Sequence, residues 1–151
     1  MTMTADHPSQ ARIRAIVEEF ALFDDWTGRY EHLIEQARGL SPLDPALRIE
    51  ANRVHGCQSQ VWLASSTDDG SMRFHADSDA LITRGLVALL VRVFDGLTPR
   101  DILSADALWL AEIGMQDHLS STRKNGLDAM VRRLKALASA TLDVHPPAPA
   151  T

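Results

Sequence analysis

The sequence predicts an α+β fold, in which helices pack on one side of a small antiparallel sheet of about three strands. Apolar residues recur at helical spacing in residues 9–38 and 80–140, whereas residues 49–75 hold short apolar stretches around a strong turn signal. A chain of 151 residues can enclose one sizeable core, so we expect a single domain over residues 9–141. The remaining segments are expected to be a flexible N-terminal tail and a disordered C-terminal tail: residues 1–8 and 142–151.

Two helices are predicted before the sheet. Ser9 is a suitable N-cap for the first, whose apolar side chains fall on one face: Ile13, Ile16, Val17 and Phe20. The second is expected from about Asp25 to Arg38, and Gly39 supplies its stop signal. The proline-containing residues 40–47 then predict a loop.

The sheet is expected in the middle of the chain. Residues 49–55 alternate weakly and predict a first strand, while residues 58–65 predict a better second strand. Asp68-Asp69-Gly70 is a strong turn signal, after which residues 71–75 return as a third strand. This places Cys57 at the turn between the first two strands.

The rest of the chain is predicted to be mainly helical. Asp77-Ser78-Asp79 offers caps for a helix from about Ala80 to Phe94, which is apolar nearly all round and therefore expected at the centre of the core. Thr98-Pro99 starts a short helix, and Ala107 to Ile113 form another short apolar segment. A long helix is expected from Ser121 to about Ala140. Its basic residues are expected to face water: Arg132, Arg133 and Lys135.

Composition excludes several classes of protein. Fifteen Lys and Arg against twenty Asp and Glu give a net charge of −5, which attracts neither nucleic acid nor an anionic membrane. The longest uncharged apolar run, Leu86 to Val91, is far too short to span a bilayer. Residues 1–12 lack the apolar stretch of a secretory signal. A single cysteine fits a reducing compartment, so we expect a cytoplasmic protein.

Cys57 is the single cysteine and the main candidate for chemistry. Alone it cannot form an internal disulfide, a tetrahedral zinc site or an iron–sulfur site, so its second sulfur or its substrate must come from another molecule. Its reactive form is the thiolate, which Arg53, His55 and the amides of residues 56–59 are placed in the sequence to favour. Gly56 permits a positive φ beside it. The alternative is a buried cysteine that acts as a small apolar side chain.

The residues around Cys57 resemble those of a known family. Asn52-Arg-Val-His-Gly-Cys57 and its continuation, Gly56-Cys-Gln-Ser-Gln-Val-Trp62, are similar to the sulfur-acceptor motif of the SufE family of cysteine desulfuration proteins. Further family landmarks follow in the same order: Asp77-Ser-Asp79 with Ile82, Gly85 and Leu86; Thr98-Pro-Arg-Asp-Ile102; His118-Leu-Ser-Ser-Thr-Arg123; and Gly126-Leu-Asp-Ala-Met130. The resemblance spans roughly residues 10–140 and implies a fold like that of SufE and IscU.

What the resemblance implies is a sulfur carrier. A PLP-dependent, SufS-like cysteine desulfurase would hold sulfur from L-cysteine as a persulfide, and the Cys57 thiolate would take that sulfur and deliver it to a SufB-like iron–sulfur scaffold. The carrier would stimulate the desulfurase rather than act as a stand-alone enzyme. It would need no metal and no cofactor, because the PLP belongs to the partner. The sequence is compatible with a monomer or a weak homodimer.

The resemblance also implies roles for residues near Cys57. Four residues are expected to shape the loop or to contact the partner: His55, Gly56, Gln58 and Ser59. Asp79 would hold the loop or the partner surface, and its alternative is a helix N-cap. His118 and Arg123 match positions before the last helix, where Arg123 would stabilise a thiolate or contact the desulfurase, or simply be solvated. The thiol is expected to be tucked against apolar neighbours on a loop that opens when the partner binds.

Three rival functions follow from the same residues. An IscU-like metal or cluster scaffold would need His55, His118 or Asp79 as further ligands, and these have no compact spacing. A cysteine hydrolase needs a histidine base, and a turn separates His55 from Cys57. A regulator that binds the desulfurase without accepting sulfur is the third alternative.

Overall fold

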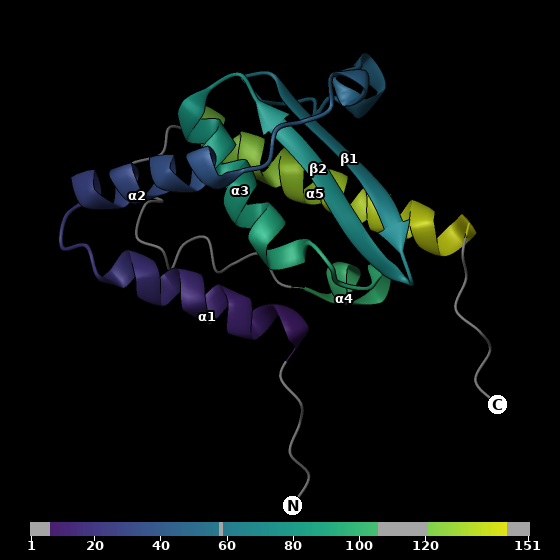
Figure 1. Cartoon of the computed structure of the whole chain (residues 1–151), viewed down its shortest axis with the longest axis horizontal. Coiled ribbons are helices and arrows are strands. Elements are labelled where there is room, and N and C mark those ends of the chain that lie inside the picture. Colours follow the sequence, from purple (N-terminus) through teal and green to yellow (C-terminus); the bar gives the residue numbers. More distant parts are fainter. Residues whose placement is uncertain (1–6, 58, 106–120, 145–151) are drawn as a thin grey trace, which may run out of the picture.

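The computed structural model describes residues 7–57, 59–105 and 121–144, with side chains from Asn125 onward in the last range. Within these ranges an antiparallel hairpin is accompanied by α-helices and two short 3-10 helices. Figure 1 shows α5 running behind the hairpin, with α1 and α2 set to one side of it and α3 between. The predicted α+β class is confirmed. The predicted tails lie largely outside the described residues, although the last helix continues past residue 141.

The first two helices form where their apolar spacing predicts. Helix α1 (Pro8–Ala21) begins earlier than expected, because His7 rather than Ser9 is its N-cap and accepts a hydrogen bond from the Ser9 amide at 3.1 Å. Ser9 is buried inside the first turn, so the predicted cap is wrong. Helix α2 (Trp26–Gly39) has Asp25 as its N-cap, which accepts a hydrogen bond from the Gly28 amide at 2.8 Å.

The hairpin joins β1 (Val61–Asp68) to β2 (Ser71–Ser78) through a two-residue turn. Asp69 and Gly70 have φ angles of 52° and 83°, as a type I′ turn requires of both central residues. This turn type matches the right-handed twist of the strands. The predicted turn is therefore confirmed.

The described residues form two strands rather than about three. After the short helix η1 (Pro45–Leu47), the expected first strand is replaced by a second 3-10 helix, η2 (Glu50–Asn52), and a single bridge from Arg53 to Trp62. The Asn52 side chain donates to the Leu47 carbonyl at 2.9 Å, a local bond that competes with strand pairing. Cys57 therefore lies in a loop between η2 and β1, and β1 begins at Val61.

Helix α3 (Leu81–Phe94) is the central element that its composition predicts. It packs against α1, α2, α5 and β2, and ten of its fourteen residues are buried. Its N-cap is Ala80, which makes no side-chain cap bond, so the predicted capping by residues 77–79 is wrong. Gly85 brings α3 close to α2, because a Cβ there would lie 2.5 Å from the Leu33 carbonyl oxygen.

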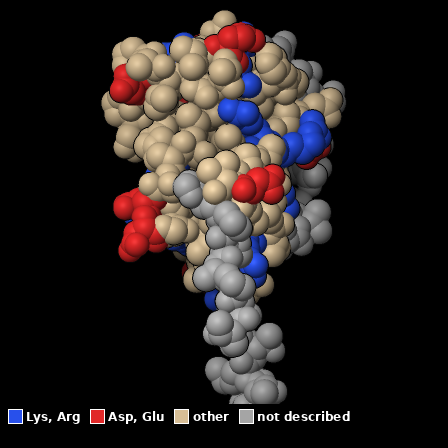
Figure 2. Space-filling view, turned by 90° about the vertical axis from the view of Figure 1, so that its right-hand side faces the viewer, with Lys and Arg blue, Asp and Glu red and all other residues tan. Residues whose placement is uncertain are grey.

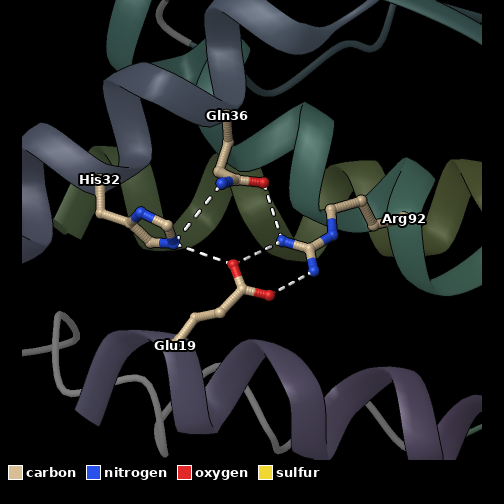
Figure 3. A network of polar contacts seen from close by, with 4 residues as sticks. All are labelled: Glu19, His32, Gln36 and Arg92. Carbon is tan, nitrogen blue, oxygen red and sulfur yellow. Dashed lines mark hydrogen bonds and ion pairs between the residues drawn. The ribbon is translucent and has the colours of Figure 1, made fainter. Parts of the chain in front are cut away.

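A polar network joins the first three helices (Figure 3). Glu19 of α1 accepts hydrogen bonds from Arg92 of α3 at 2.6 and 3.1 Å, and lies 3.0 Å from the imidazole of His32 on α2. Gln36 of α2 accepts a further hydrogen bond from Arg92 at 2.8 Å. Hydrogen bonding from Arg92 holds the pKa of Glu19 below its ordinary value. The network therefore ties the helical layer together by ionised groups.

The last described helix packs against both the hairpin and the short helix before it. The predicted short helix is α4 (Pro99–Ser104), with Thr98 as its N-cap, and it packs against α5 (Ser121–Val144). Arg133 of α5 donates to the carbonyl oxygens of Leu63 at 3.3 Å and Ala51 at 3.2 Å. Lys135 likewise donates to the Ala105 carbonyl at 2.9 Å. These two side chains thus bind backbone instead of only facing water, whereas Arg132 is exposed as predicted.

The predicted apolar segment at residues 107–113 lies outside the described residues.

Candidate functional site

Cys57 is half-buried in the loop that leads from η2 into β1. Gly56, just before it, has a φ of +97°, a conformation that favours glycine. A hydrogen bond from the Val54 amide to the Val61 carbonyl at 2.8 Å closes the base of the loop. The loop is therefore pinned at its base and turns sharply beside the thiol.

The loop rests on two small residues of α5. The Cys57 thiol points to the Gly126 carbonyl oxygen, with 3.5 Å between sulfur and oxygen. A Cβ on Gly126 would lie 3.3 Å from the Cys57 sulfur, and a Cβ on Gly56 would lie 3.4 Å from the Ala129 methyl. Residues 126 and 129 are three apart in a helix and so share one face. The loop between η2 and β1, called the cysteine loop below, packs on this face of α5. The surface at Gly126 and Ala129 is called its seat.

Burial controls the ionisation of the thiol. Desolvation raises the pKa of Cys57 above its ordinary value, which disfavours the thiolate. The two groups expected to favour the anion are directed at Glu50 instead: Arg53 lies 3.7 Å and His55 3.6 Å from its carboxylate oxygens. In this conformation the thiol is therefore protonated at neutral pH and withdrawn.

The C-terminal end of the loop, at residues 59 and 60, is hydrogen-bonded to the start of α3. The Asp79 carboxylate accepts a hydrogen bond from the Gln60 amide at 3.0 Å, and the Asp79 amide donates to the Gln60 carbonyl at 3.2 Å. Ser59 and Thr83 share a hydrogen bond at 3.3 Å between their hydroxyl oxygens. Asp79 thus binds the loop and is not the N-cap of α3.

A buried carboxylate supports the strands beneath the loop. Asp77 is almost fully buried and forms ion pairs with Arg48 and with Arg84, the latter at 3.2 Å. The Arg48 guanidinium also lies over the Trp62 ring, 4.9 Å from its centroid. These contacts bury Trp62 and hold the segment before η2 against the hairpin.

Some predicted site residues fall outside this description, and other neighbours were not predicted. Gln58, His118 and the Arg123 side chain lie outside the described residues. Thr83, Gly126 and Ala129 contact the loop, although the sequence had marked Gly126 only as a family landmark. An isolated glycine inside a helical pattern is itself a signal of close packing.

The thiol does not open into either of two surface hollows. One, of about 540 Å³, lies beside Arg92, and the other, of about 460 Å³, lies beside Pro99; neither is lined by a residue of the cysteine loop. Within the described ranges, no three His, Cys, Asp or Glu side chains gather so as to hold a metal ion. Neither hollow is therefore a binding site for a reactant of Cys57.

The outer surface shows no broad charged area on the face drawn in Figure 2. Most of that face is uncharged, and its basic and acidic side chains are intermixed. A phosphate-binding surface would instead concentrate Lys and Arg. Across the described part of the chain, no helix is both long and apolar enough to cross a membrane.

Fold and site together define a class: a small α+β protein whose one cysteine sits on a loop, seated against a helix. The chain belongs to the SufE family, because the family model described as "SufE: Fe-S metabolism associated domain" matches residues 14–138. This confirms the resemblance seen in the sequence and associates the protein with iron–sulfur metabolism.

Individual relatives agree with this assignment. An uncharacterized SufE-like protein of Rhizobium meliloti is 40% identical over 132 residues, covering 84% of this chain and 94% of the relative. A similar protein of Rhizobium etli is 39% identical over 130 residues, covering 83% and 88%. The solution structure of a hypothetical protein from Thermus thermophilus shares the fold, with a TM-score of 0.73 at 23% identity, covering 87% of this chain and 96% of that one.

Proposed function

We propose that this protein is a sulfur carrier of iron–sulfur metabolism, which accepts persulfide sulfur from a PLP-dependent cysteine desulfurase on Cys57. It then delivers the sulfur to an iron–sulfur cluster scaffold and stimulates the desulfurase. The proposal is supported by one observation above all: the single thiol of a SufE-family chain is half-buried on a loop that hydrogen bonds hold against α3 and α5. The PLP belongs to the desulfurase, and the carrier takes no cofactor.

The transfer needs only one cysteine in this chain. The Cys57 thiol loses its proton, and the thiolate attacks the terminal sulfur of the persulfide on the desulfurase cysteine. A new sulfur–sulfur bond forms on Cys57 as the old one breaks. The desulfurase cysteine leaves as a thiolate with the bonding electron pair. Cys57 becomes a persulfide and the desulfurase cysteine is regenerated, with no external oxidant.

The resting geometry suits a carrier that must not react prematurely. A thiol whose pKa is raised by burial is a weak nucleophile at neutral pH. The Asp79–Gln60 and Ser59–Thr83 hydrogen bonds hold the C-terminal end of the loop against α3. Each contributes about 1 kcal/mol to the stability of this conformation. A docking partner can offset contacts of this size, so binding of the desulfurase would expose the thiol.

The proposal is tested by intact mass measurement. The protein is mixed with a cysteine desulfurase and L-cysteine, and its mass is recorded without reductant. The expected result is added sulfur on Cys57 that dithiothreitol removes. Cys57→Ser is the control and should gain none. An unmodified Cys57 beside an actively turning-over desulfurase would overturn the proposal.

The same variant separates a carrier from a regulator. A carrier stimulates desulfurase turnover by removing its persulfide sulfur, so Cys57→Ser should lose that stimulation. Stimulation retained by Cys57→Ser would show that the protein regulates the desulfurase by binding alone.

A further inference from the structure

We propose that Gly126 is a positioning residue for sulfur acceptance: its missing side chain makes the seat in which α5 holds the Cys57 thiol withdrawn until a partner docks. This inference rests on the proposed function and adds a residue to it. Gly126 lies far from Cys57 in the sequence, in the last helix, and is buried.

The contact, and not the backbone, is what requires glycine at this position. The described glycines with positive φ are Gly56, Gly70 and Gly96, so Gly126 has an ordinary helical backbone that any residue adopts. Glycine inside a helix is unfavourable relative to alanine. An alanine at 126 would therefore favour the helix and disturb only the neighbours of its methyl group.

Those neighbours belong to the cysteine. A Cβ on Gly126 would lie 3.3 Å from the sulfur of Cys57 and 3.7 Å from both its Cα and its Cβ. The whole Cys57 residue thus lies over the bare helix surface at Gly126. A methyl group there fills the seat and makes the sulfur give way by a few tenths of an ångström or leave.

The loop, and not the helix, is the side that yields. Helix α5 packs into the core through Leu127, Met130 and Leu134, whereas the loop residue Cys57 is only half-buried. A side chain at 126 should therefore push the thiol toward water. It would imitate the opened state that we assign to the desulfurase complex.

Thiol reactivity reports this movement because burial is what raises the pKa of Cys57. None of the charged side chains described on the neighbouring elements adds to this change in the pKa of Cys57. These side chains are Glu50, Arg53 and His55 before it, Asp79 before α3, and Asp128 on α5. Moving the thiol toward water should therefore lower its pKa toward the ordinary value.

The test compares Gly126→Ala with Gly39→Ala, a matched glycine in α2 whose added Cβ would meet nothing within 4 Å. Iodoacetamide alkylation of Cys57 is followed as a function of pH, and circular dichroism checks the fold. We expect Gly126→Ala to react severalfold faster at pH 7, because a thiol moved toward water has a lower pKa and is therefore present as thiolate in a larger fraction of molecules. Its rate–pH profile should shift to lower pH, and Gly39→Ala should react like the wild type.

An unchanged or slower rate in a folded Gly126→Ala protein would overturn the inference. If that variant folds poorly, a stability cycle decides the matter. In a Cys57→Ala background the sulfur is absent, so adding Gly126→Ala should raise the urea midpoint of unfolding, whereas in the wild type it should not. Equal effects in both backgrounds would show that Gly126 does not act through the thiol.

The outcomes also separate this inference from the proposed function. A wild-type protein that takes no sulfur from an active desulfurase sinks the proposed function and, with it, the role of the seat in sulfur acceptance. Normal sulfur uptake by the wild type, with no difference in alkylation rate between the two glycine variants, would overturn the positioning role of Gly126 and leave the proposed function standing.

Discussion

Gly85 and Gly126 both lie inside helices, and both let another segment approach closely, yet the two contacts differ in kind. Beside Gly85 the neighbour is backbone: an added Cβ would lie 2.5 Å from the Leu33 carbonyl oxygen. Beside Gly126 the neighbour is a loop side chain, with the Cys57 sulfur at 3.3 Å. The first contact joins two helices of the core, and the second seats a half-buried loop on a helix.

The difference teaches that a missing side chain can serve either a rigid scaffold or a movable reactive group. The α2–α3 contact is reinforced by buried apolar residues and by the hydrogen bond from Arg92 to Gln36, so moving the two helices apart would cost stability. The cysteine loop is fastened by a few hydrogen bonds that a partner can replace. Two measurements distinguish the regions: the free energy of unfolding in urea, and the rate at which iodoacetamide alkylates Cys57.

The largest loss of stability is expected for Gly85→Ala, which introduces a methyl group into the contact between α2 and α3. We expect a loss of about 2 kcal/mol or more in unfolding free energy, because overpacking typically costs about 1–3 kcal/mol even after neighbours shift. Alkylation of Cys57 in the folded protein should stay at the wild-type rate. Gly39→Ala, with nothing near its added methyl, should lose no stability. Comparable stability of both variants would contradict the rigid contact.

A smaller effect is expected for Arg133→Met, which removes the link between α5 and the hairpin while keeping an apolar stem. We expect a loss of about 1–2 kcal/mol in urea unfolding, since two carbonyl oxygens, those of Leu63 and Ala51, lose a charged donor. Arg132→Met is the matched control on the exposed side of the same helix. If both variants unfold alike, the hydrogen bonds of Arg133 do not hold the sheet.

Asp79→Ala should act on the loop more than on the scaffold. Removing the acceptor of the Gln60 amide should cost about 1 kcal/mol of stability and raise the alkylation rate of Cys57, because the loop loses a fastening at its far end. Asp79→Asn keeps an acceptor oxygen and should stay close to the wild type in both measurements. An alkylation rate that does not respond to Asp79→Ala would show that this bond does not control the loop.

The smallest effect is expected for Glu19→Gln, and it should depend on pH. The pKa of Glu19 is lowered from its ordinary value near 4.5, so ionised Glu19 stabilises the fold above that pH, and the contribution is lost as the pH falls through the lowered value. We expect a loss of about 0.5 kcal/mol at neutral pH for this partly exposed pair. The difference from wild type should vanish in acid.

Urea unfolding at several pH values checks this prediction, with the exposed neighbour variant Glu18→Gln as control. The alkylation rate of Cys57 should not change in either variant at neutral pH. A Glu19→Gln deficit that is as large in acid as at neutral pH would mean that the carboxylate charge is not its cause.

Local signals were enough for the helices and the hairpin turn. The apolar spacing of α3 and the Asp69-Gly70 turn express preferences that act within a few residues, and both formed as predicted. The expected strand at residues 49–55 failed because its alternation was weak and local hydrogen bonding competed with it. Arg133 was misjudged for a related reason, because it binds the backbone of a segment that is distant in the sequence. The bond from Asp79 to the loop matches the role that the family resemblance implied, which no local pattern indicated.

The sequence by itself determined the α+β class, the family, and the fact that one thiol must work with a sulfur or substrate from outside. These follow from residue periodicity, from an ordered set of motifs, and from the count of a single cysteine. Only the tertiary structure decided what surrounds that thiol. Cys57 and Gly126 meet because α5 folds back behind the hairpin, and burial in that contact, which no local pattern encodes, sets the ionisation of the sulfur.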